Sequence, residues 1–452
     1  MSERRSQTIW YRMRIVALAA LLLTLLAACS AVRTSPPAAS YDAEVATSWF
    51  GMALNLVQKT PGFTPPVASR VFGYLGVALY ETVRPGLPGY RSLAGQLNGL
   101  ETLPQPNALA RYHWPAAANS ALASLTHRLF PTAPPEMMTA VDALEAYFAQ
   151  EFAAQEDATT LARSAAWGKI MANAIYAWSM TDGGHEGYLH SFSDAYLPPS
   201  GPGMWVSTPP TFAQALQPYW GQNRPFVLSA ADDCPAPPPP AYSEEANSPF
   251  YAEALEVYDS GRSRSEEQVQ IALFWADDPG RTATPPGHWI SILGQILEEG
   301  SYTLDKAAEA YAKVGVVVTD AFITCWRTKY QYNLLRPITY IQQVIDTEWN
   351  ASAITDPVIT PPFPEYTSGH SVQSSAVVVV LTSLFGEGYA FTDHTHDALG
   401  LPPHSFPSFT AAAEEAAISR LYGGIHYRSA IVNGLAQGRC VAEKILALDF
   451  QQ

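Results

Sequence analysis

The sequence predicts an all-α protein built from helical bundles. Apolar residues recur three and four positions apart along most of the chain, which is the spacing of one helix face, while strand-like alternation is scarce. Hydrophobic residues form 48% of the 452 residues, enough for a large buried core. The 37 prolines exceed the usual share of about 5%, so we expect long ordered connections between helices.

The negative net charge of the chain indicates which classes of binding partner are favoured. The formal net charge is −15, whereas nucleic-acid binding depends on basic residues that neutralise phosphates. Nucleic acid is therefore a poor candidate, but a small anion is not, because a local cluster of arginine and lysine can reverse the overall sign.

The first 29 residues are typical of a lipoprotein signal peptide. Basic residues precede an apolar run over residues 15–28, the right length for a signal-peptide core and short for a bilayer span. Small residues then lead to Cys29, which would carry the lipid; a plain signal peptide with an incidental cysteine is the alternative. We expect an exported protein, lipid-anchored to the bacterial cell envelope, and Ser30 after the cysteine favours the outer membrane or a periplasm-facing position.

Five helices are expected in the N-terminal half, residues 30–260, at 41–57, 68–82, 106–130, 135–152 and 161–180. An irregular stretch rich in proline and glycine follows over residues 181–248. Connections of this length are unusual and often functional, so we expect an ordered wrap around the helices.

The other helices are expected at 248–260, 265–275, 288–299, 303–335, 371–385, 408–422 and 427–448. The long one should stop before Pro337, because a residue that precedes proline is biased away from helix. Residues 261–452 are predicted to form a second helical domain.

Three cysteines remain after Cys29. In an oxidising compartment one pair could form a disulfide and leave one thiol. Cys325 stands in an apolar helical pattern typical of a core residue, so Cys234 and Cys440 are the expected pair.

Two basic residues at the end of the long helix stand among aromatic side chains. Lys329 and Arg336 are seven residues apart, so we expect them on one helix face. Alone they are typical of a solvated pair. Cations among so much aromatic surface would, however, need an anion to balance their burial.

The segment Ser368-Gly369-His370 leads directly into an apolar helix. Free N–H groups and the positive end of the helix dipole meet at such a position, which favours oxyanion binding. Gly369 would let the backbone approach closely. An N-cap serine followed by a surface histidine is the alternative.

A third segment places Arg420 six residues before His426, with two glycines turning the chain between them. Alone, Arg420 would more often form a surface ion pair. Together the three segments supply three cations, an N–H nest and two histidines, which describe a pocket for a tetrahedral oxyanion.

In order and spacing these segments resemble the superfamily of vanadium-dependent haloperoxidases and type 2 phosphatidic acid phosphatases. The family pattern is Lys-x6-Arg-Pro, then Ser-Gly-His, then Ser-Arg-x5-His. This chain carries the three parts at residues 329–337, 368–370 and 419–426. The resemblance covers residues 300–450 and implies a haloperoxidase- and phosphatase-like helical core.

The resemblance implies vanadate as cofactor and a role for each pocket residue. His426 would bond the central atom, as vanadium ligand in a peroxidase or phospho-acceptor in a phosphatase, and His370 would be the general acid–base. Ser368 and the Gly369 N–H would hydrogen-bond the oxygens of the oxyanion. The cations that would neutralise those oxygens are Lys329, Arg336 and Arg420.

Several features favour the haloperoxidase branch. The chain after the signal peptide has no long apolar run, whereas the lipid phosphatases of the superfamily span membranes. Trp326 stands where chloroperoxidases carry it, and Phe363 stands where bromoperoxidases tend to carry histidine; both would line the cofactor pocket. Asp278 could pair with a pocket arginine or simply cap a turn.

One position departs from the family pattern. Many members carry aspartate four residues after the last histidine, where it orients that imidazole, but this chain has Ala430. The departure weakens the phosphatase interpretation. It also leaves His426 to be oriented by another group, such as a backbone carbonyl.

Other histidines are ambiguous. His394 and His396 follow the Ser-Gly-His helix in a polar loop, and their spacing could indicate a second metal, although a rim over the pocket is favoured. His288, at the start of a helical pattern, is expected to support core packing.

Three functions are considered. The first is a vanadate-dependent haloperoxidase that oxidises a halide with hydrogen peroxide. The second is an acid phosphatase that hydrolyses phosphomonoesters through a phospho-histidine in the same pocket. The third is a non-catalytic oxyanion-binding envelope lipoprotein, against which His370 and His426 argue, because an anion binder needs no general acid. The sequence does not indicate the halide, the organic acceptor or the oligomeric state.

Overall fold

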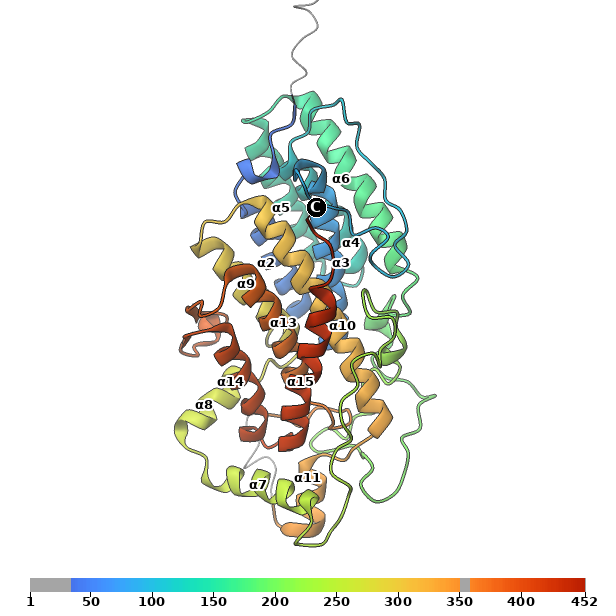
Figure 1. The fold of residues 1–452 in the computed structure, drawn as a ribbon, viewed down its shortest axis with the longest axis vertical. Helices are drawn as coiled ribbons and strands as arrows, with labels where there is room; N and C mark the ends of the chain where they lie inside the picture. Colours follow the sequence, from blue (N-terminus) through green and yellow to red (C-terminus); the bar gives the residue numbers. More distant parts are fainter. Residues whose placement is uncertain (1–33, 350–357, 452) are drawn as a thin grey trace, which may run out of the picture.

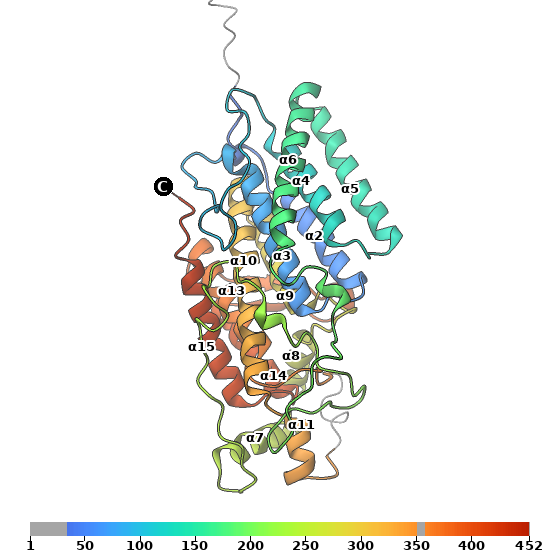
Figure 2. The same ribbon diagram turned by 90° about the vertical axis from the view of Figure 1, so that its right-hand side faces the viewer.

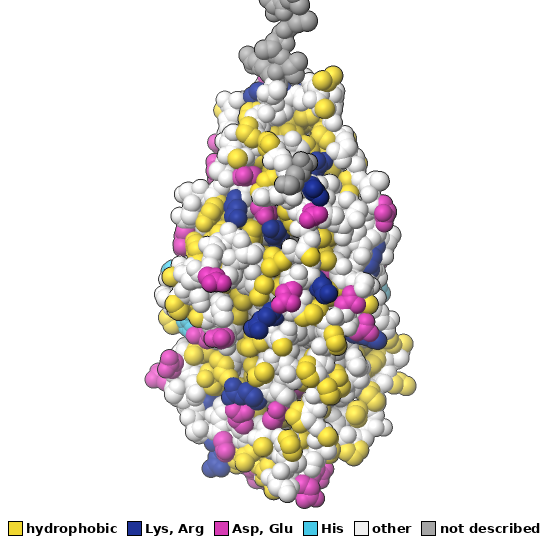
Figure 3. Space-filling model, in the orientation of Figure 1, with side chains coloured by type: hydrophobic (Ala, Val, Ile, Leu, Met, Phe, Trp, Pro, Cys, Tyr) yellow, Lys and Arg dark blue, Asp and Glu magenta, His cyan; other side chains and the backbone are white. Residues whose placement is uncertain are grey.

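The computed structural model describes residues 34–349 and 358–451 and confirms the all-α prediction. Helical bundles form an elongated body in which α10 (Leu304–Tyr332) runs through the middle (Figure 1). The predicted signal peptide and Cys29 lie outside the described residues. On the face that Figure 3 shows, acidic and basic side chains are interspersed.

The N-terminal bundle lies around α3, which is buried over its whole length. Its members are α2 (Glu44–Lys59), α3 (Pro65–Val83), α4 (Trp114–Leu129), α5 (Pro135–Ala153) and α6 (Ala158–Ser179). The outer pair, α5 and α6, is seen in Figure 2. Glycines allow the backbones of α3 and α10 to approach closely: a Cβ at Gly76 would lie 2.3 Å from the carbonyl oxygen of Tyr311.

The expected helix over 106–130 begins later than predicted, at Trp114. Pro106 cannot start it, because the residues that follow form a turn and His113 takes the N-cap position. The Ala116 N–H donates to His113 Nδ1 at 3.2 Å. His113 must be neutral at Nδ1 to accept this bond, and burial lowers its pKa to about 4.

This cap makes stability depend on pH. The pKa of His113 is depressed in the folded state, so its contribution is present above about pH 6.5 and is lost as pH falls towards 4. We expect the free energy of unfolding to fall by about 3 kcal/mol more in the wild type than in His113→Asn over this window, because asparagine caps without titrating. Urea unfolding of both proteins at a series of pH values measures the difference; parallel curves would contradict the assignment.

The stretch from residue 181 to 248 is irregular, as predicted, and is an ordered wrap. Asp320 on α10 accepts the N–H groups of Phe226, Val227 and Leu228 at 2.6, 2.9 and 3.1 Å. The predicted disulfide between Cys234 and Cys440 is confirmed, and Cys325 is a free, buried thiol. The wrap is thus tied both to α10 and to the last helix.

The second half packs around α13, most of which is buried. Its helices are α7 (Pro249–Ser263), α8 (Glu266–Phe274), α9 (Thr284–Glu299), α10, α13 (Gly369–Phe385), α14 (Phe409–Tyr422) and α15 (Arg428–Ile445). Helix α9 begins four residues before the predicted start, since Pro285 and Pro286 suit the first helical turn. The division of the chain at residue 260 stays a prediction.

Some short elements were not predicted. A helical turn, α11 (Pro337–Tyr340), follows α10 and continues into η5 (Ile341–Ile345). Strands β1 (Phe391–Asp393) and β2 (His404–Phe406) form an antiparallel hairpin in which Phe391 faces Phe406. The remaining short turns are η1 (Ala38–Ser40), η2 (Arg84–Gly86), η3 (Gly187–Leu189), η4 (Trp220–Gln222) and η6 (Asp397–Leu399). Among the described helices, none combines the length and apolar character that crossing a membrane requires.

Candidate active site

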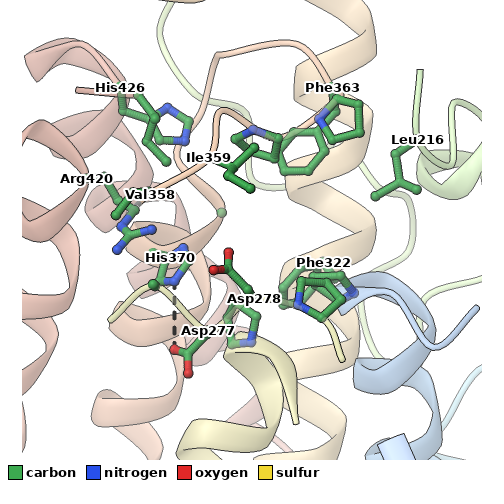
Figure 4. Close-up of a pocket in the computed structure, with 18 of the residues that line it drawn as sticks. Leu216, Asp277, Asp278, Phe322, Val358, Ile359, Phe363, His370, Arg420 and His426 are labelled. Carbon is green, nitrogen blue, oxygen red and sulfur yellow. Dashed lines mark ion pairs between the residues drawn. The ribbon is translucent and has the colours of Figure 1, made fainter. Parts of the chain in front are cut away.

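The three segments singled out in the sequence meet at one cavity of about 580 Å³ (Figure 4). Its walls come from α10, the start of α13, the end of α14 and the loops at 276–285 and 358–363. Gly369, His370, Arg420 and His426 line it directly, together with Trp326 and Phe363. Side chains more than a hundred residues apart in the sequence are therefore brought to one place.

His426 presents one ring nitrogen to this site. Its Nδ1 lies 2.7 Å from Glu365 Oε1, and its Nε2 lies 3.3 Å from Arg336 Nη1. The same Glu365 oxygen accepts the Tyr427 N–H at 2.9 Å, so we assign it as an acceptor and Nδ1 as the protonated nitrogen. Nε2 then keeps its lone pair. Burial, followed by the charges of Arg336 and Lys329, holds the pKa of His426 well below its usual value.

Glu365 is the functional residue that the sequence analysis missed. The group that replaces the missing aspartate at Ala430 is the Glu365 carboxylate and not a backbone carbonyl, which was the example considered above. The carbonyl of Ala430 instead accepts the Ser368 N–H at 3.1 Å. Burial raises the pKa of Glu365, and the cations Arg336 and Lys329 oppose that rise. The available signal was a single acidic residue inside an otherwise apolar segment, five positions before His370.

Arg336 and Lys329 lie behind the wall of the cavity and are fully buried. The expectation that they share one helix face was wrong, because α10 ends at Tyr332 and Arg336 follows as the N-cap residue of α11. Arg336 donates from Nε to the Phe363 carbonyl at 2.8 Å and from Nη1 to the Ile425 carbonyl at 2.9 Å. Lys329 Nζ donates to the carbonyl oxygens of Pro364, Glu365 and Thr367. Lys329 therefore supports the loop that carries Glu365 and also adds positive charge beside the cavity.

This lysine should stabilise the protein as well as its anion site. Lys329→Met is expected to lower the free energy of unfolding by about 3 kcal/mol, because three buried carbonyls lose their charged donor. Guanidinium unfolding monitored by circular dichroism measures the change. The control is Lys313→Met, a lysine of the same helix that pairs with Glu309 and should cost less than about 1 kcal/mol. Equal effects of the two changes would contradict the supporting role of Lys329.

The Ser-Gly-His segment starts α13 as predicted. Ser368 is the N-cap, and its hydroxyl accepts the Ser371 N–H at 3.3 Å. His370 Nε2 lies 3.9 Å from Asp277 Oδ2, the contact marked by the dashed line in Figure 4, which becomes an ion pair when His370 is protonated. Burial and the nearby charge of Arg420 lower the pKa of His370 well below its usual value. His370 is thus a neutral base at the cavity wall.

Arg420 and Asp278 both line the cavity (Figure 4). Arg420 is buried and donates to the Ala272 carbonyl at 3.2 Å. Burial raises the pKa of Asp278, and Arg420 lies near enough for its charge to oppose that rise. Among the described residues Asp278 makes no ion pair with an arginine, so the pairing alternative is not confirmed. Its carbonyl also accepts the N–H groups of Arg281 and Thr282, which closes a turn.

The opposite wall is apolar. The rings of Trp326 and Phe363 lie 5.0 Å apart, and Phe322, Leu216 and Ile359 extend the surface. Lys329 Nζ lies 5.0 Å from the centre of the Phe363 ring. The site therefore has a cationic side and an aromatic side.

The residues fit an oxyanion such as vanadate. Arg336 Nη2 and His370 Nε2 are buried and have no hydrogen-bond partner among the described residues. Leaving such groups unpaired is costly. A protonated oxyanion in the cavity would satisfy both, by accepting from Arg336 Nη2 and donating an O–H to His370 Nε2. Three buried cations beside the cavity, Lys329, Arg336 and Arg420, favour the same occupant.

The prediction of a loop rim was wrong for His396. This side chain is buried, and its Nε2 lies 3.1 Å from Asp277 Oδ1. His394 is exposed and pairs with Asp397. His288, expected to serve core packing, lies between two carboxylates, 2.9 Å from Asp277 and 2.7 Å from Asp393.

Comparisons with known proteins agree on one family. Residues 309–451 match the family described as the VCPO second helical-bundle domain. The crystal structure of the first bacterial vanadium-dependent iodoperoxidase superposes with a TM-score of 0.81 at 39% identity, over 90% of this chain and 96% of that one. That match supports a common architecture for nearly the whole described body.

Two further relatives are more distant. The vanadium chloroperoxidase of Curvularia inaequalis is 25% identical over 387 residues, which cover 72% of this chain and 63% of the length of the chloroperoxidase. A holo-type bacterial vanadium-dependent chloroperoxidase shares the fold, with a TM-score of 0.63 at 15% identity over 85% of this chain and 93% of that one.

Proposed function

Because the chain belongs to the vanadium-dependent haloperoxidase superfamily, we propose that it is a vanadate-dependent haloperoxidase, which oxidises a halide with hydrogen peroxide. The observation that carries the proposal is the state of His426. Glu365 accepts a hydrogen bond from the proton-bearing Nδ1, and Nε2 lies beside the buried Arg336 guanidinium, which has an N–H without a partner among the described residues. A lone pair beside an unpaired cation is suited to an oxyanion centred on a metal.

Each pocket residue has a role in this proposal. His426 Nε2 would bond vanadium, and Ser368 and the Gly369 N–H would hydrogen-bond the oxygens. The cations that would balance the charge are Lys329, Arg336 and Arg420. When bound, vanadate supplies a Lewis acid that activates hydrogen peroxide.

His370 would act as the general acid–base that transfers the proton of hydrogen peroxide. Its imidazole is neutral at physiological pH, since burial and Arg420 disfavour the charged form. It can accept a proton from hydrogen peroxide as the peroxide enters the site and return it to the departing oxygen. Asp277, 3.9 Å from Nε2, would stabilise the imidazolium between the two transfers.

Iodide is the halide we propose first. The relative at 39% identity is described as an iodoperoxidase, and the apolar wall formed by Trp326, Phe363 and Ile359 suits a large ion. Removing such an ion from water costs less than removing a small one.

The test is a paired assay on the full-length protein in detergent. One arm supplies orthovanadate, hydrogen peroxide and iodide, bromide or chloride, and follows halogenation of a phenol indicator. The other omits vanadate and peroxide and supplies a chromogenic phosphate monoester. Vanadate-dependent halogenation supports the proposal. If neither arm shows activity while the protein still binds vanadate, a non-catalytic oxyanion binder would be favoured instead.

The phosphatase remains the second candidate because of one observation. The absence of aspartate at Ala430 argued against a nucleophilic histidine, but Glu365 provides a carboxylate at 2.7 Å from His426. A histidine paired in this way can act as a nucleophile towards phosphorus. Phosphate release that vanadate inhibits, without halogenation, would move the protein to this branch.

We also propose that the protein is exported and held on the cell envelope through a lipid on Cys29. The disulfide between Cys234 and Cys440 supports this location, because disulfides persist in oxidising compartments. Metabolic labelling with a fatty acid, in wild type and in Cys29→Ser, tests the anchor; equal labelling of both would contradict it.

A further inference from the structure

A buried cluster lies beside the oxyanion pocket, and of its members only Asp277, as the partner of His370, has a role in the function described above. Asp277, His288 and His396 place one donor atom each within 4.8 Å of one another, and all three side chains are buried. They come from the loop after α8, from α9 and from the turn between β1 and β2. We propose that these three residues bind one divalent first-row metal ion, separate from vanadate.

The donor set suits such an ion. Two imidazoles and one carboxylate are ligands of zinc and its neighbours. Asp277 Oδ1 lies 3.1 Å both from His288 Nδ1 and from His396 Nε2. In a tetrahedral zinc site with bonds of about 2.0–2.1 Å, neighbouring donors are about 3.3 Å apart, so small movements would complete the geometry.

Asp393 lies behind the cluster and supports His288 as a second carboxylate supports a histidine that binds a metal. His288 turns Nδ1 towards Asp277, while its Nε2 donates to Asp393 Oδ2 at 2.7 Å. Asp393 is held in turn by the Thr395 N–H at 2.9 Å. A carboxylate that binds the far nitrogen of a histidine fixes the ring and makes it a better metal ligand.

The charge and the access also fit. Asp277 and Asp393 are buried, and among the described residues neither has a lysine or arginine within 4 Å. His288 lies between them with one carboxylate on each ring nitrogen, at 2.9 and 2.7 Å. A divalent ion would displace the proton on Nδ1 and balance the two carboxylates with both imidazoles neutral. A second cavity of about 240 Å³, which His426 does not line, reaches Asp277, His288 and His396 and provides a path for the ion and room for a water ligand.

The metal would join three separate segments, so its effect should be visible without any enzymatic assay. We expect the full-length protein, prepared without a histidine tag and dialysed against a chelator, to take up about one Zn²⁺ per chain, measured by mass spectrometry of the metal. Zn²⁺ should raise Tm by about 3 °C. Co²⁺ in its place should give the visible absorption of a tetrahedral site.

The variants separate this site from the vanadate pocket. His288→Ala and His396→Ala should each lower the affinity for Zn²⁺ at least about 100-fold and abolish the rise in Tm. His426→Ala should keep both, and so should the control His404→Ala, whose ring pairs with Glu415 outside the cluster. If His288→Ala does not fold, His396→Gln provides the same comparison.

Two results would overturn the proposal. One is a wild-type protein that holds no Zn²⁺ after equilibration with the free ion, which would make the cluster a network of hydrogen bonds alone. The other is Zn²⁺ uptake that His426→Ala removes and His396→Ala leaves intact. Neither result depends on whether the protein oxidises halides.

Discussion

Replacing His426 by alanine is expected to lower vanadate-dependent kcat/KM by about 1,000-fold or more. In the proposed function this side chain makes the bond between protein and vanadium, and the methyl group of alanine cannot make that bond. Loss of that bond should also release the cofactor. We therefore expect His426→Ala to pass through gel filtration without vanadium, whereas the wild type retains it.

The change should leave the fold intact. The His426 ring lies at the cavity, and its partner Glu365 keeps the N–H of Tyr427 as donor. His404→Ala removes the same side chain away from the site and should retain both activity and vanadium. Circular dichroism and Tm of both variants check folding. If His426→Ala keeps more than about a tenth of the activity, another residue bonds the vanadium.

The long, strongly periodic helices could be predicted from the sequence. Helices α3, α5 and α14 begin and end within three residues of the expected positions, because proline and N-cap residues mark their ends. The late start of α4 could not be predicted in this way, since it depends on His113 capping through its ring nitrogen, and histidine is not a usual N-cap residue.

The hairpin of β1 and β2 shows a second limit. Each strand has three residues, too few for a period of two to be recognised. The two strands are held together by Phe391 and Phe406, which pair across the hairpin and are buried in the hydrophobic core. This hairpin carries His396 inward to Asp277, so the partners of that histidine could not be found from its loop-like sequence.

Part of the site could be predicted from the sequence and part could not. The residues within short motifs of fixed spacing were predicted, because each motif is local in the sequence: Lys329, Arg336, Ser368, His370, Arg420 and His426. Glu365 could not be assigned as the partner of His426, since the two are 61 residues apart and meet only through the packing of α13 and α15. The grouping of Asp277 with His288 and His396 could not be predicted for the same reason.

Replacing Glu365 is expected to have the second large effect on activity. Glu365→Gln should lower vanadate-dependent activity by about 10–100-fold. The amide oxygen can still accept from Nδ1 of His426 and from the Tyr427 N–H, so the ring keeps its place while the negative charge that makes it a strong ligand is lost. Glu365→Ala should be more harmful, because it also removes the acceptor and leaves Arg336 and Lys329 without their buried counter-charge; the free energy of unfolding should fall by about 3–5 kcal/mol.

A nearby carboxylate serves as the matched control. Glu253 on α7 accepts the Ser429 hydroxyl at 2.7 Å, so it lies against the same turn as His426 but does not bond the imidazole. Glu253→Gln should therefore leave vanadate retention and activity within about twofold of the wild type. Steady-state rates, vanadium content and urea unfolding of the three variants separate the two roles of Glu365. If Glu365→Gln matched the control in rate and vanadium content, the carboxylate would only support the fold, and Nδ1 of His426 would need no charged partner.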